Sequence, residues 1–495
     1  MSSSDRKMRK STLELSSAEL RALAASVNDL VLEYFSEVSN LPVFPVTTGG
    51  QTAAVIGSSL PDEGVELDQL IQDCRTIIEN SRQNGHPRFF GYVASPATAP
   101  GAFADLIASA LNVNVTSWRS GPSATEVERT VICWLGSMIG YNSNSHGLLT
   151  SGGSMANLTA LLIAQRSKSA TNDRQAGLWR ADGPMTVYAS TEVHLSIPKA
   201  ADILGFGRDN VRLIECDDAF RIDVRRLRER LRADIGAGMK PFCVVGSAGT
   251  TNTGAVDPLS EIADVANEFS LWFHVDGAYG APAAMDESKR SLFTGLERAD
   301  SVSLDAHKWL YAPLDCGCLL FRDPAKARAA FGNEDADYIK VLEQEDDEAF
   351  AFWNYGPELS RRFRALKLWW TLRYFGVKRI AAAITEDNEL ASYLADLITA
   401  ADDFELLSKP QLSICCFRYL PHKLRQVNDG ELNDLNSRIM HAVQRGGHAY
   451  LSSATINDKF ALRICITNFR TTRADMDQTL DVIRDVAAKI SNGDN

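Results

Sequence analysis

The stretch Leu271-Trp272-Phe273-His274-Val275-Asp276 decides the fold of this chain, because it is an apolar run that ends in a carboxylate. About thirty residues later, the strand-like run 301–304 is followed by Ala306-His307-Lys308-Trp309. Both runs have the length of buried strands. A carboxylate or a lysine is rarely buried unless it is paired or used. We therefore predict two neighbouring strands of one sheet that deliver Asp276 and Lys308 at their carboxyl ends.

Short β-rich runs alternate with helical segments on both sides of this pair. We predict further strands at 185–189, 211–215, 242–246 and 318–321, and helices at 125–139, 156–166 and 259–268. Such alternation is typical of an α/β fold, in which helices cover both faces of a mainly parallel sheet. Ligands of these folds bind at the carboxyl ends of the strands.

The two ends of the chain have a different pattern. Near the N-terminus, Ser16 precedes an amphipathic helix, a connection follows at 42–64, and a second helix is predicted at 67–78. A long amphipathic helix begins near 366, and the remainder to residue 495 is predicted to form a smaller α+β domain.

Composition excludes several classes of protein. The chain has 495 residues, 45% of them hydrophobic, and its 51 basic and 63 acidic residues give a net charge of −12. It therefore offers no basic stripe for nucleic acid or for an anionic membrane. The basic N-terminal run is not followed by the apolar stretch of a signal peptide, and no run of about 18 apolar residues predicts a membrane span.

Nine cysteines are scattered along the chain rather than arranged as a disulfide scaffold. Neither Cys316-x-Cys318 nor Cys415-Cys416 has the second pair that a zinc site needs, so we expect no metal. We expect a soluble, cytoplasmic protein.

The loop Ser151-Gly152-Gly153-Ser154 precedes a predicted helix. Glycines allow close approach of a ligand, and the free N–H groups of a helix start attract anions, so Gly153 and Ser154 could hold a phosphate. A plain loop with a helix cap is the alternative. The loop lacks the lysine of a P-loop and the spacing of a dinucleotide fingerprint.

Two further strand ends carry polar side chains. His194 follows the predicted strand 185–189 and could stack on an aromatic ring, although a structural role is an open alternative. The turn 249–254 is rich in hydroxyls, among them Thr251, and is either a plain turn or a ligand contact.

Together these residues form an ordered set: an anion cradle, a ring-stacking histidine, a hydroxyl turn, Asp276 and Lys308. Pyridoxal 5′-phosphate (PLP) needs such a set, because its lysine forms an imine and a carboxylate keeps the pyridine nitrogen protonated. The sequence therefore predicts PLP as the cofactor.

Four further motifs show that the chain resembles the group II PLP-dependent decarboxylases, the aromatic-L-amino-acid decarboxylase family. They are His86-Pro87-Arg88-Phe89-Phe90-Gly91-Tyr92, the segment 122–128, the segment 361–369 and Lys459-Phe460-Ala461-Leu462-Arg463. The resemblance implies a PLP-dependent transferase fold of type I and a homodimer. It also implies an N-terminal helical segment that clamps the dimer (1–100), a large PLP-binding domain (101–380) and a small C-terminal domain (381–495).

The resemblance also implies roles for individual residues. Lys308 is expected to form the Schiff base, Asp276 to pair with the pyridinium, and His194 to stack on the ring. Tyr338 is expected to be the proton donor on a mobile loop. Further cofactor contacts are expected from Gly153, Ser154, Thr251, Ala278, Asp305 and His307. Substrate contacts are expected from Tyr92, Val93 and Thr116.

We expect an L-amino-acid decarboxylase that acts on an aromatic substrate and needs no nucleic-acid or membrane partner. Because Val93 and Thr116 stand where the family has phenylalanines, and Arg119 lies close by, an acidic substrate such as aspartate or glutamate is an alternative. A decarboxylation-dependent aldehyde synthase is another, which the presence of Tyr338 disfavours. An aminotransferase, a sulfur-abstracting lyase and a non-catalytic homologue are further alternatives.

Overall fold

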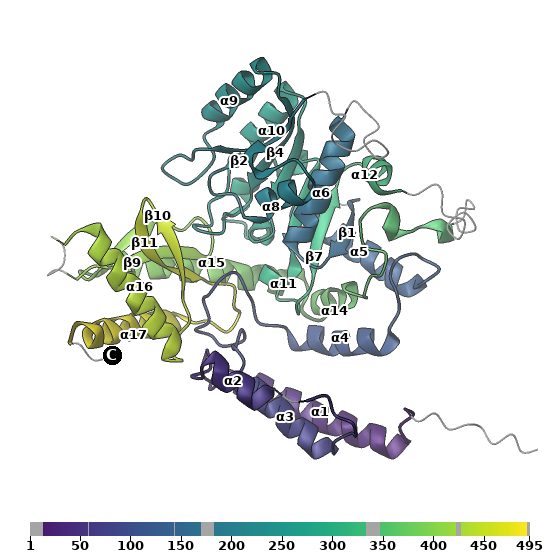
Figure 1. Ribbon diagram of the computed structural model, residues 1–495, viewed down its shortest axis with the longest axis vertical. Coiled ribbons are helices and arrows are strands. Elements are labelled where there is room, and N and C mark those ends of the chain that lie inside the picture. The colour runs from purple at the N-terminus through teal and green to yellow at the C-terminus, as the bar shows by residue number, and fades with distance from the viewer. Residues whose placement is uncertain are drawn as a thin grey trace, which may run out of the picture.

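The computed structural model describes residues 13–57, 59–142, 144–169, 183–332, 347–421 and 427–492. Its main body is built on a seven-stranded sheet with the strand order β1-β7-β6-β5-β4-β2-β3 (Figure 1). The strands are β1 (His146–Thr150), β2 (Met185–Ser190), β3 (Val211–Ile214), β4 (Lys240–Ser247), β5 (Trp272–Asp276), β6 (Ser301–Asp305) and β7 (Gly317–Phe321).

The two strands that we expected to be neighbours are paired. β5 and β6 run parallel, with Asp276 opposite Ser303, and β2, β3 and β4 continue the parallel pairing. β7 runs antiparallel between β6 and β1. The mainly parallel sheet is thus confirmed. Strand β1 was not predicted, because its short run lies between a polar turn and the glycine loop that attracted attention as a ligand site.

Alternation along β5 and β6 separates a polar face from an apolar face of the sheet. His274 and Asp276 point to one side of β5, and Ser301, Ser303 and Asp305 point to the same side of β6, since partners in register share a face. Val275 and Val302 point to the other side. All five residues of each strand are buried, so polar side chains of the site are held inside the body rather than at its surface.

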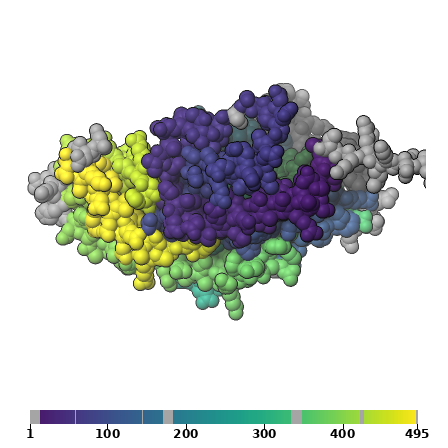
Figure 2. Space-filling view, turned by 90° about the horizontal axis from the view of Figure 1, so that it is seen from below, coloured from purple at the N-terminus to yellow at the C-terminus, as the bar shows by residue number. Residues whose placement is uncertain are grey.

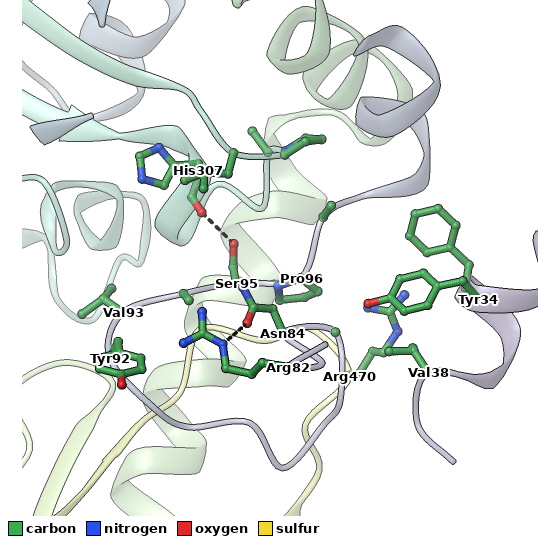
Figure 3. Close-up of a pocket in the computed structure, with 17 residues that line it drawn as sticks. Tyr34, Val38, Arg82, Asn84, Tyr92, Val93, Ser95, Pro96, His307 and Arg470 are labelled. Carbon is green, nitrogen blue, oxygen red and sulfur yellow. Dashed lines mark hydrogen bonds between the residues drawn. The ribbon is translucent and has the colours of Figure 1, made fainter. Parts of the chain in front are cut away.

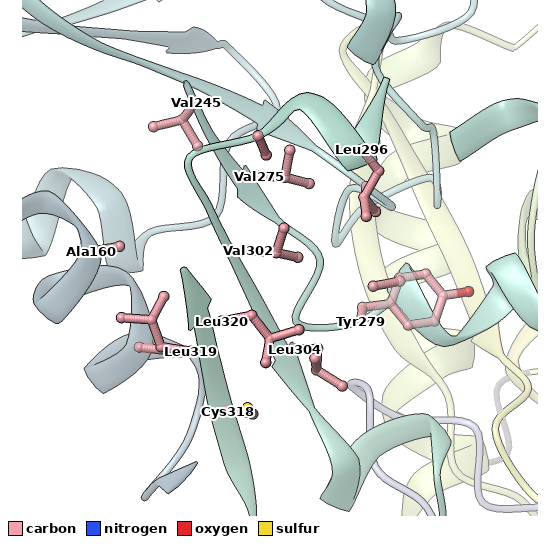
Figure 4. Close-up of a cluster of buried hydrophobic side chains, with 14 of the residues drawn as sticks. Ala160, Val245, Val275, Tyr279, Leu296, Val302, Leu304, Cys318, Leu319 and Leu320 are labelled. Carbon is pink, nitrogen blue, oxygen red and sulfur yellow. The ribbon is translucent and has the colours of Figure 1, made fainter. Parts of the chain in front are cut away.

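Helix α6 covers the polar face of the central strands. Its alanines Ala156, Ala160 and Ala164 are fully buried and allow the helix to approach the sheet closely. In Figure 4, Val245 and Leu319 lie on the side of Ala160. The helices that surround the sheet are α5 (Pro122–Met138), α6 (Gly153–Lys168), α8 (Ser196–Ile203), α9 (Val224–Gly236), α10 (Leu259–Glu268), α12 (Pro324–Phe331) and α14 (Ala365–Phe375).

A second, smaller domain follows α14. Gly376 has φ +75°, a left-handed conformation that glycine adopts without strain, and it separates α14 from α15 (Val377–Ala400). The domain contains an antiparallel sheet, β10-β11-β9-β8, covered by helices (Figure 1). Its other elements are β8 (Phe404–Ser408), β9 (Ile414–Tyr419), α16 (Asp429–Arg445), β10 (Ser452–Ile456), β11 (Lys459–Cys465) and α17 (Arg473–Asn492). The predicted α+β character of this region is confirmed.

Three N-terminal helices form an arm beneath the body, α1 (Ser17–Glu37), α2 (Gly49–Ile56) and α3 (Leu67–Glu79). The side chains of Ser16 and Glu19 form a capping box at the start of α1. Helix α2 lies in the stretch that we expected to be a connection. Figure 2 shows the arm lying across one face of the molecule beside the C-terminal helix. Helix α4 (Ala99–Leu111) then leads into the body.

No helix within the described residues has both the length and the apolar character needed to cross a membrane. The same residues contain no group of three or more histidine, cysteine, aspartate or glutamate side chains that could hold a metal ion.

Candidate active site

Asp276 ends β5 and is buried, with 8% of its surface exposed. One carboxylate oxygen accepts from the amide nitrogen of Asn157 at 2.8 Å, and the other accepts from Ser303 Oγ at 3.1 Å and from the N–H of Ala278 at 3.2 Å. Burial by itself would raise the pKa of this carboxyl, but the surrounding basic groups, led by His194, lower it below its ordinary value. Asp276 is therefore a buried carboxylate that stays ionised.

Lys308 lies on the single turn α11 (Ala306–Trp309), which directly follows β6. Its Nζ is 3.0 Å from Oδ2 of Asp305, whose side chain is only 2% exposed. The other oxygen of Asp305, Oδ1, has no hydrogen-bond partner in the described part of the chain. This buried carboxylate orients the amine of Lys308 at the edge of the sheet next to Asp276.

Both the side chain and the backbone carbonyl of His307 are hydrogen-bonded. Its Nδ1 accepts from the N–H of Cys316 at 3.1 Å, and its carbonyl accepts from Ser95 Oγ at 3.1 Å. Burial lowers the pKa of His307, although the nearby Asp305 opposes this shift. The turn α11 that carries Lys308, here called the lysine turn, is thus fixed to the residue before β7 and to the loop around Ser95.

His194 lies between β2 and α8, at the same sheet edge. Its Nδ1 is 2.8 Å from Ser196 Oγ and 3.2 Å from the backbone nitrogen of Ser196. The ring is accessible from the open side of the site, yet the surrounding protein partly desolvates it and lowers its pKa. The nearby carboxylate of Asp276 opposes this lowering of the pKa, and Lys308 adds to it.

The start of α6 lies against the ends of β5 and β6. Gly152 caps the helix without a side-chain hydrogen bond, so the first N–H groups of the 16-residue helix carry no side-chain cap. A Cβ on Gly153 would lie 2.8 Å from Cβ of Ala278 and 3.0 Å from Oδ2 of Asp305. Ser154 is exposed. The predicted anion cradle therefore opens beside Asp305 and Lys308, and only glycine fits at residue 153.

The hydroxyl turn 249–254 is hydrogen-bonded to Arg463, which the sequence analysis named only within a resemblance motif and not as a site residue. Arg463 is buried on β11, and its guanidinium donates to the carbonyls of Thr251 at 2.9 Å and Tyr92 at 2.8 Å. Its Nη2 is buried without a partner in the described residues. Thr251 itself is exposed. The signal for Arg463 was an arginine at the centre of the apolar strand 459–465.

Tyr92 and Val93 line a cavity of about 610 Å³ next to the lysine turn. Figure 3 shows Arg82, Ser95 and His307 around the same space. The guanidinium of Arg82 lies 5.2 Å from the ring centre of Tyr92. The cavity thus combines aromatic and cationic groups.

Two predicted residues lie elsewhere in the structure. Thr116 is buried, its carbonyl accepts from the N–H of Phe352, and it does not line the cavity around Tyr92. Arg119 forms an ion pair with Glu348 at 3.7 Å, and both side chains are largely exposed. Tyr338 lies outside the described residues.

The comparisons with known proteins agree with this geometry. Residues 50–420 match the family model of the pyridoxal-dependent decarboxylase conserved domain. The chain is 36% identical over 480 residues to the aromatic-L-amino-acid decarboxylase of Bacillus atrophaeus, covering 97% of this chain and 98% of that protein. It is 28% identical over 495 residues to the phenylacetaldehyde synthase of Petunia hybrida, covering 98% and 97%.

The crystal structure of Oryza sativa TDC with PLP and tryptamine superposes with a TM-score of 0.89 at 27% identity, covering 97% of this chain and 100% of that one. The family match, the near full-length relatives and the paired strands β5 and β6 all point to the same conclusion. The chain belongs to the pyridoxal-dependent decarboxylase family, and it is a PLP-dependent amino-acid decarboxylase of fold-type I.

Proposed function

We propose that this enzyme decarboxylates an aromatic L-amino acid at its α-carboxylate and releases the corresponding amine. The observation that carries the proposal is the placement of Asp276 and Lys308 at the ends of the adjacent strands β5 and β6. The aromatic substrate class rests on the Bacillus atrophaeus decarboxylase, to which the chain is similar over nearly its whole length.

The residues at the sheet edge fit PLP. Lys308 would hold the cofactor covalently through Nζ, and Asp276 would accept a hydrogen bond from the pyridinium nitrogen. The N-terminus of α6, with Gly153 and Ser154, would hold the phosphate, because its N–H groups are uncapped and residue 153 leaves no room for a side chain. When bound, PLP supplies an electron sink for the bond that breaks at the substrate's α-carbon.

Further contacts follow from the same geometry. His194 would stack on the ring, while Thr251, Ala278, Asp305 and His307 would surround the cofactor. Tyr92 and Val93 would contact the substrate from the cavity beside the lysine turn. Thr116 does not line this cavity in its own chain, and because the family resemblance implies active sites at the dimer interface, Thr116 would contribute to the partner's site.

Three residues of the chain would control where protons are held and delivered during the reaction. Asp276 remains ionised because it accepts three hydrogen bonds, so it favours a protonated partner opposite it. Asp305 orients the amine of Lys308 before substrate binds. Tyr338 would return a proton to the α-carbon after CO2 has left.

The test is a substrate panel in which CO2 release and product identity are both measured. The panel contains tyrosine, tryptophan, phenylalanine, aspartate and glutamate, and we expect amine formation from at least one aromatic member. Lys308→Ala should abolish it. Lys367→Met is the control, because Lys367 is a fully buried lysine that pairs with Asp105 at 2.8 Å outside the site. Decarboxylation of only aspartate or glutamate would overturn the aromatic assignment.

An aldehyde synthase is the second candidate, because the chain resembles the Petunia hybrida phenylacetaldehyde synthase over 98% of its length. Such an enzyme consumes oxygen and yields aldehyde and peroxide instead of amine. Tyr338 supports the amine-forming reaction, since a phenol can protonate the α-carbon. Peroxide production by the unmodified enzyme would favour the synthase.

We also propose a homodimer in which the N-terminal segment 1–100 clamps the partner, the segment 101–380 binds PLP and the segment 381–495 forms the small domain. Eleven of the 24 exposed large hydrophobic side chains among the described residues lie between residues 13 and 77. Such a concentration is typical of a surface that is covered in an assembly. A cytoplasmic location is supported by the nine cysteines, all of which are free thiols.

A further inference from the structure

A chain of hydrogen bonds starts beneath the site at Trp272. An indole N–H can only donate, and that of Trp272 donates to Ser301 Oγ at 2.8 Å. Ser301 is fully buried, and its hydroxyl lies 2.9 Å from Nδ1 of His274. Ser301 Oγ accepts from the indole and still has its own hydrogen, which it can donate to Nδ1 of His274.

The next hydrogen bond in this chain joins His274 to Asn157. Burial lowers the pKa of His274 to about 4, so the ring is neutral at pH 7 and carries one hydrogen. Nε2 lies 2.9 Å from Oδ1 of Asn157, so the orientation of the Asn157 amide decides which ring nitrogen carries this hydrogen.

The orientation of the Asn157 amide is fixed independently from the other side. Its nitrogen lies 2.8 Å from Oδ2 of Asp276 and 2.8 Å from Ser196 Oγ. A flipped amide would place its oxygen against the ionised carboxylate of Asp276, so the nitrogen must face Asp276. Oδ1 of Asn157 therefore faces Nε2 of His274, which places the ring hydrogen on Nε2 and leaves Nδ1 to accept from the Ser301 hydroxyl.

Ser196 is the last member of this chain of hydrogen bonds and contacts the ring of His194, which faces the cofactor site. Its hydroxyl accepts from Asn157 and is 2.8 Å from Nδ1 of His194, to which the backbone N–H of Ser196 also points at 3.2 Å. Nδ1 of His194 thus accepts two hydrogen bonds and carries no proton, so the ring hydrogen is on Nε2.

We propose that Asn157 and His274 are positioning residues for the decarboxylation, because they fix His194 as the Nε2–H tautomer and supply Asp276 with a donor. The described residues offer no hydrogen-bond partner to Nε2 of His194, so this proton is available to bound molecules. The inference rests on the proposed placement of PLP between His194 and Asp276. The test of this inference measures which ring nitrogen of His194 carries the proton and does not measure turnover. The inference can therefore fail while the proposed function stands.

The first experiment measures the tautomer directly. Full-length, PLP-loaded enzyme is labelled with ¹⁵N in its histidine rings, and the signals of His194 are identified by their loss in His194→Asn. We expect Nε2 to be protonated and Nδ1 to be unprotonated at pH 7. Protonation at Nδ1 in the unmodified enzyme would overturn the proposal.

The second experiment changes the hydrogen-bonding groups of residue 157. Asn157→Asp has the same shape but places an oxygen where the amide nitrogen donates to Asp276 and Ser196, so residues 157 and 276 must share one proton. The Ser196 hydroxyl then donates to residue 157, and Nδ1 of His194 keeps only the 3.2 Å contact with the Ser196 N–H. We expect His194 to move toward the Nδ1–H tautomer, the pH profile of the cofactor's visible absorption to shift, and kcat to fall about 10- to 100-fold. An unchanged tautomer would refute the proposed role of Asn157.

Asn436→Asp is the matched control. Asn436 is a fully buried asparagine of the small domain whose amide nitrogen also donates to two acceptors, the carbonyls of Tyr419 and Leu432. It should lower stability and leave the His194 tautomer and the absorption profile unchanged. If Asn157→Asp fails to fold, His274→Phe replaces it, and His274→Gln, which keeps a donor for Asn157, should restore the unmodified spectrum. Equal spectra for the Phe and Gln variants would also overturn the proposal.

Discussion

At the scale of single residues, the site depends on one carboxylate, Asp276, that is buried and nevertheless ionised. Asp276 is stable in this state because an amide, a hydroxyl and a backbone N–H donate to its two oxygens. Such charge-assisted hydrogen bonds are stronger than those between neutral groups. The sequence predicted the carboxylate and its strand, whereas its donors come from α6, β6 and the turn after β5.

Replacing Asp276 by asparagine should separate the charge from the shape of this group. We expect Asp276→Asn to fold, to bind PLP more weakly and to lose about 100- to 1,000-fold in kcat, because the fixed negative charge opposite the pyridine nitrogen is lost. Steady-state kinetics and the visible absorption of the cofactor measure this. Asp286→Asn is the control, since Asp286 is equally buried but bonds to Ser288 and Asn388 outside the site. Comparable losses in both variants would point to a general effect of burial.

At the scale of elements, the N-terminus of α6 should be sensitive to a single methyl group. In Gly153→Ala, the new Cβ would lie 2.8 Å from Cβ of Ala278, so the helix start or the turn after β5 must shift. We expect the dissociation constant of PLP to rise about tenfold or more, as measured by fluorescence titration of the apoenzyme. Gly236→Ala at the end of α9 is the control, because no atom lies within 4 Å of the added carbon. Equal affinity in the two variants would argue against the proposed phosphate cradle.

Helix α15 braces the segment that follows Lys308. Asp387 on this helix accepts from Nε1 of Trp309 at 2.8 Å and from the hydroxyl of Tyr311 at 2.7 Å. The ring of Trp309 in turn stacks on Tyr279, with centroids 5.1 Å apart. The turns after β5 and β6 are therefore locked to each other and to the small domain.

This brace predicts a pH dependence of stability. Burial raises the pKa of Asp387 to about 7 from an ordinary value of 3.8, so the folded state binds its proton more tightly than the unfolded state. The stabilising contribution is complete below pH 3.8 and is lost as the pH rises toward 7. Between pH 5 and pH 7 the free energy of unfolding should fall by on the order of 2 kcal/mol through this group. Urea titrations at fixed protein concentration should show a weaker pH dependence for Asp387→Asn. Parallel profiles would contradict the assignment.

At the scale of the whole molecule, the elements were more predictable than their contacts. Hydrophobic runs indicated six of the seven strands of the large sheet, and the ends of β5 and β6 indicated Asp276 and Lys308. Asn157, Ser196 and Arg463 could not be found in this way, because they lie in helices or strands far apart along the chain and gain meaning only from tertiary contacts. Thr116 and Tyr338 remain predictions, since their roles depend on a partner chain and on residues outside the described ranges.

The exposed arm predicts the state of assembly. Helices α1 and α2 pack on α3, and the arm leaves Leu32 and Ile77 exposed at 57% and 48%. Covering such side chains in a dimer stabilises it by about 25 cal/mol for each Å² of apolar surface. We expect twice the chain mass of 54.2 kDa in light scattering.

A double variant, Leu32→Glu with Ile77→Glu, should weaken the dimer. Because Thr116 would then lose its place in the partner's site, the variant should also have lower activity at low protein concentration. Ile235→Glu on α9, where the isoleucine is 46% exposed, should change neither. A monomeric, fully active enzyme would refute the clamp.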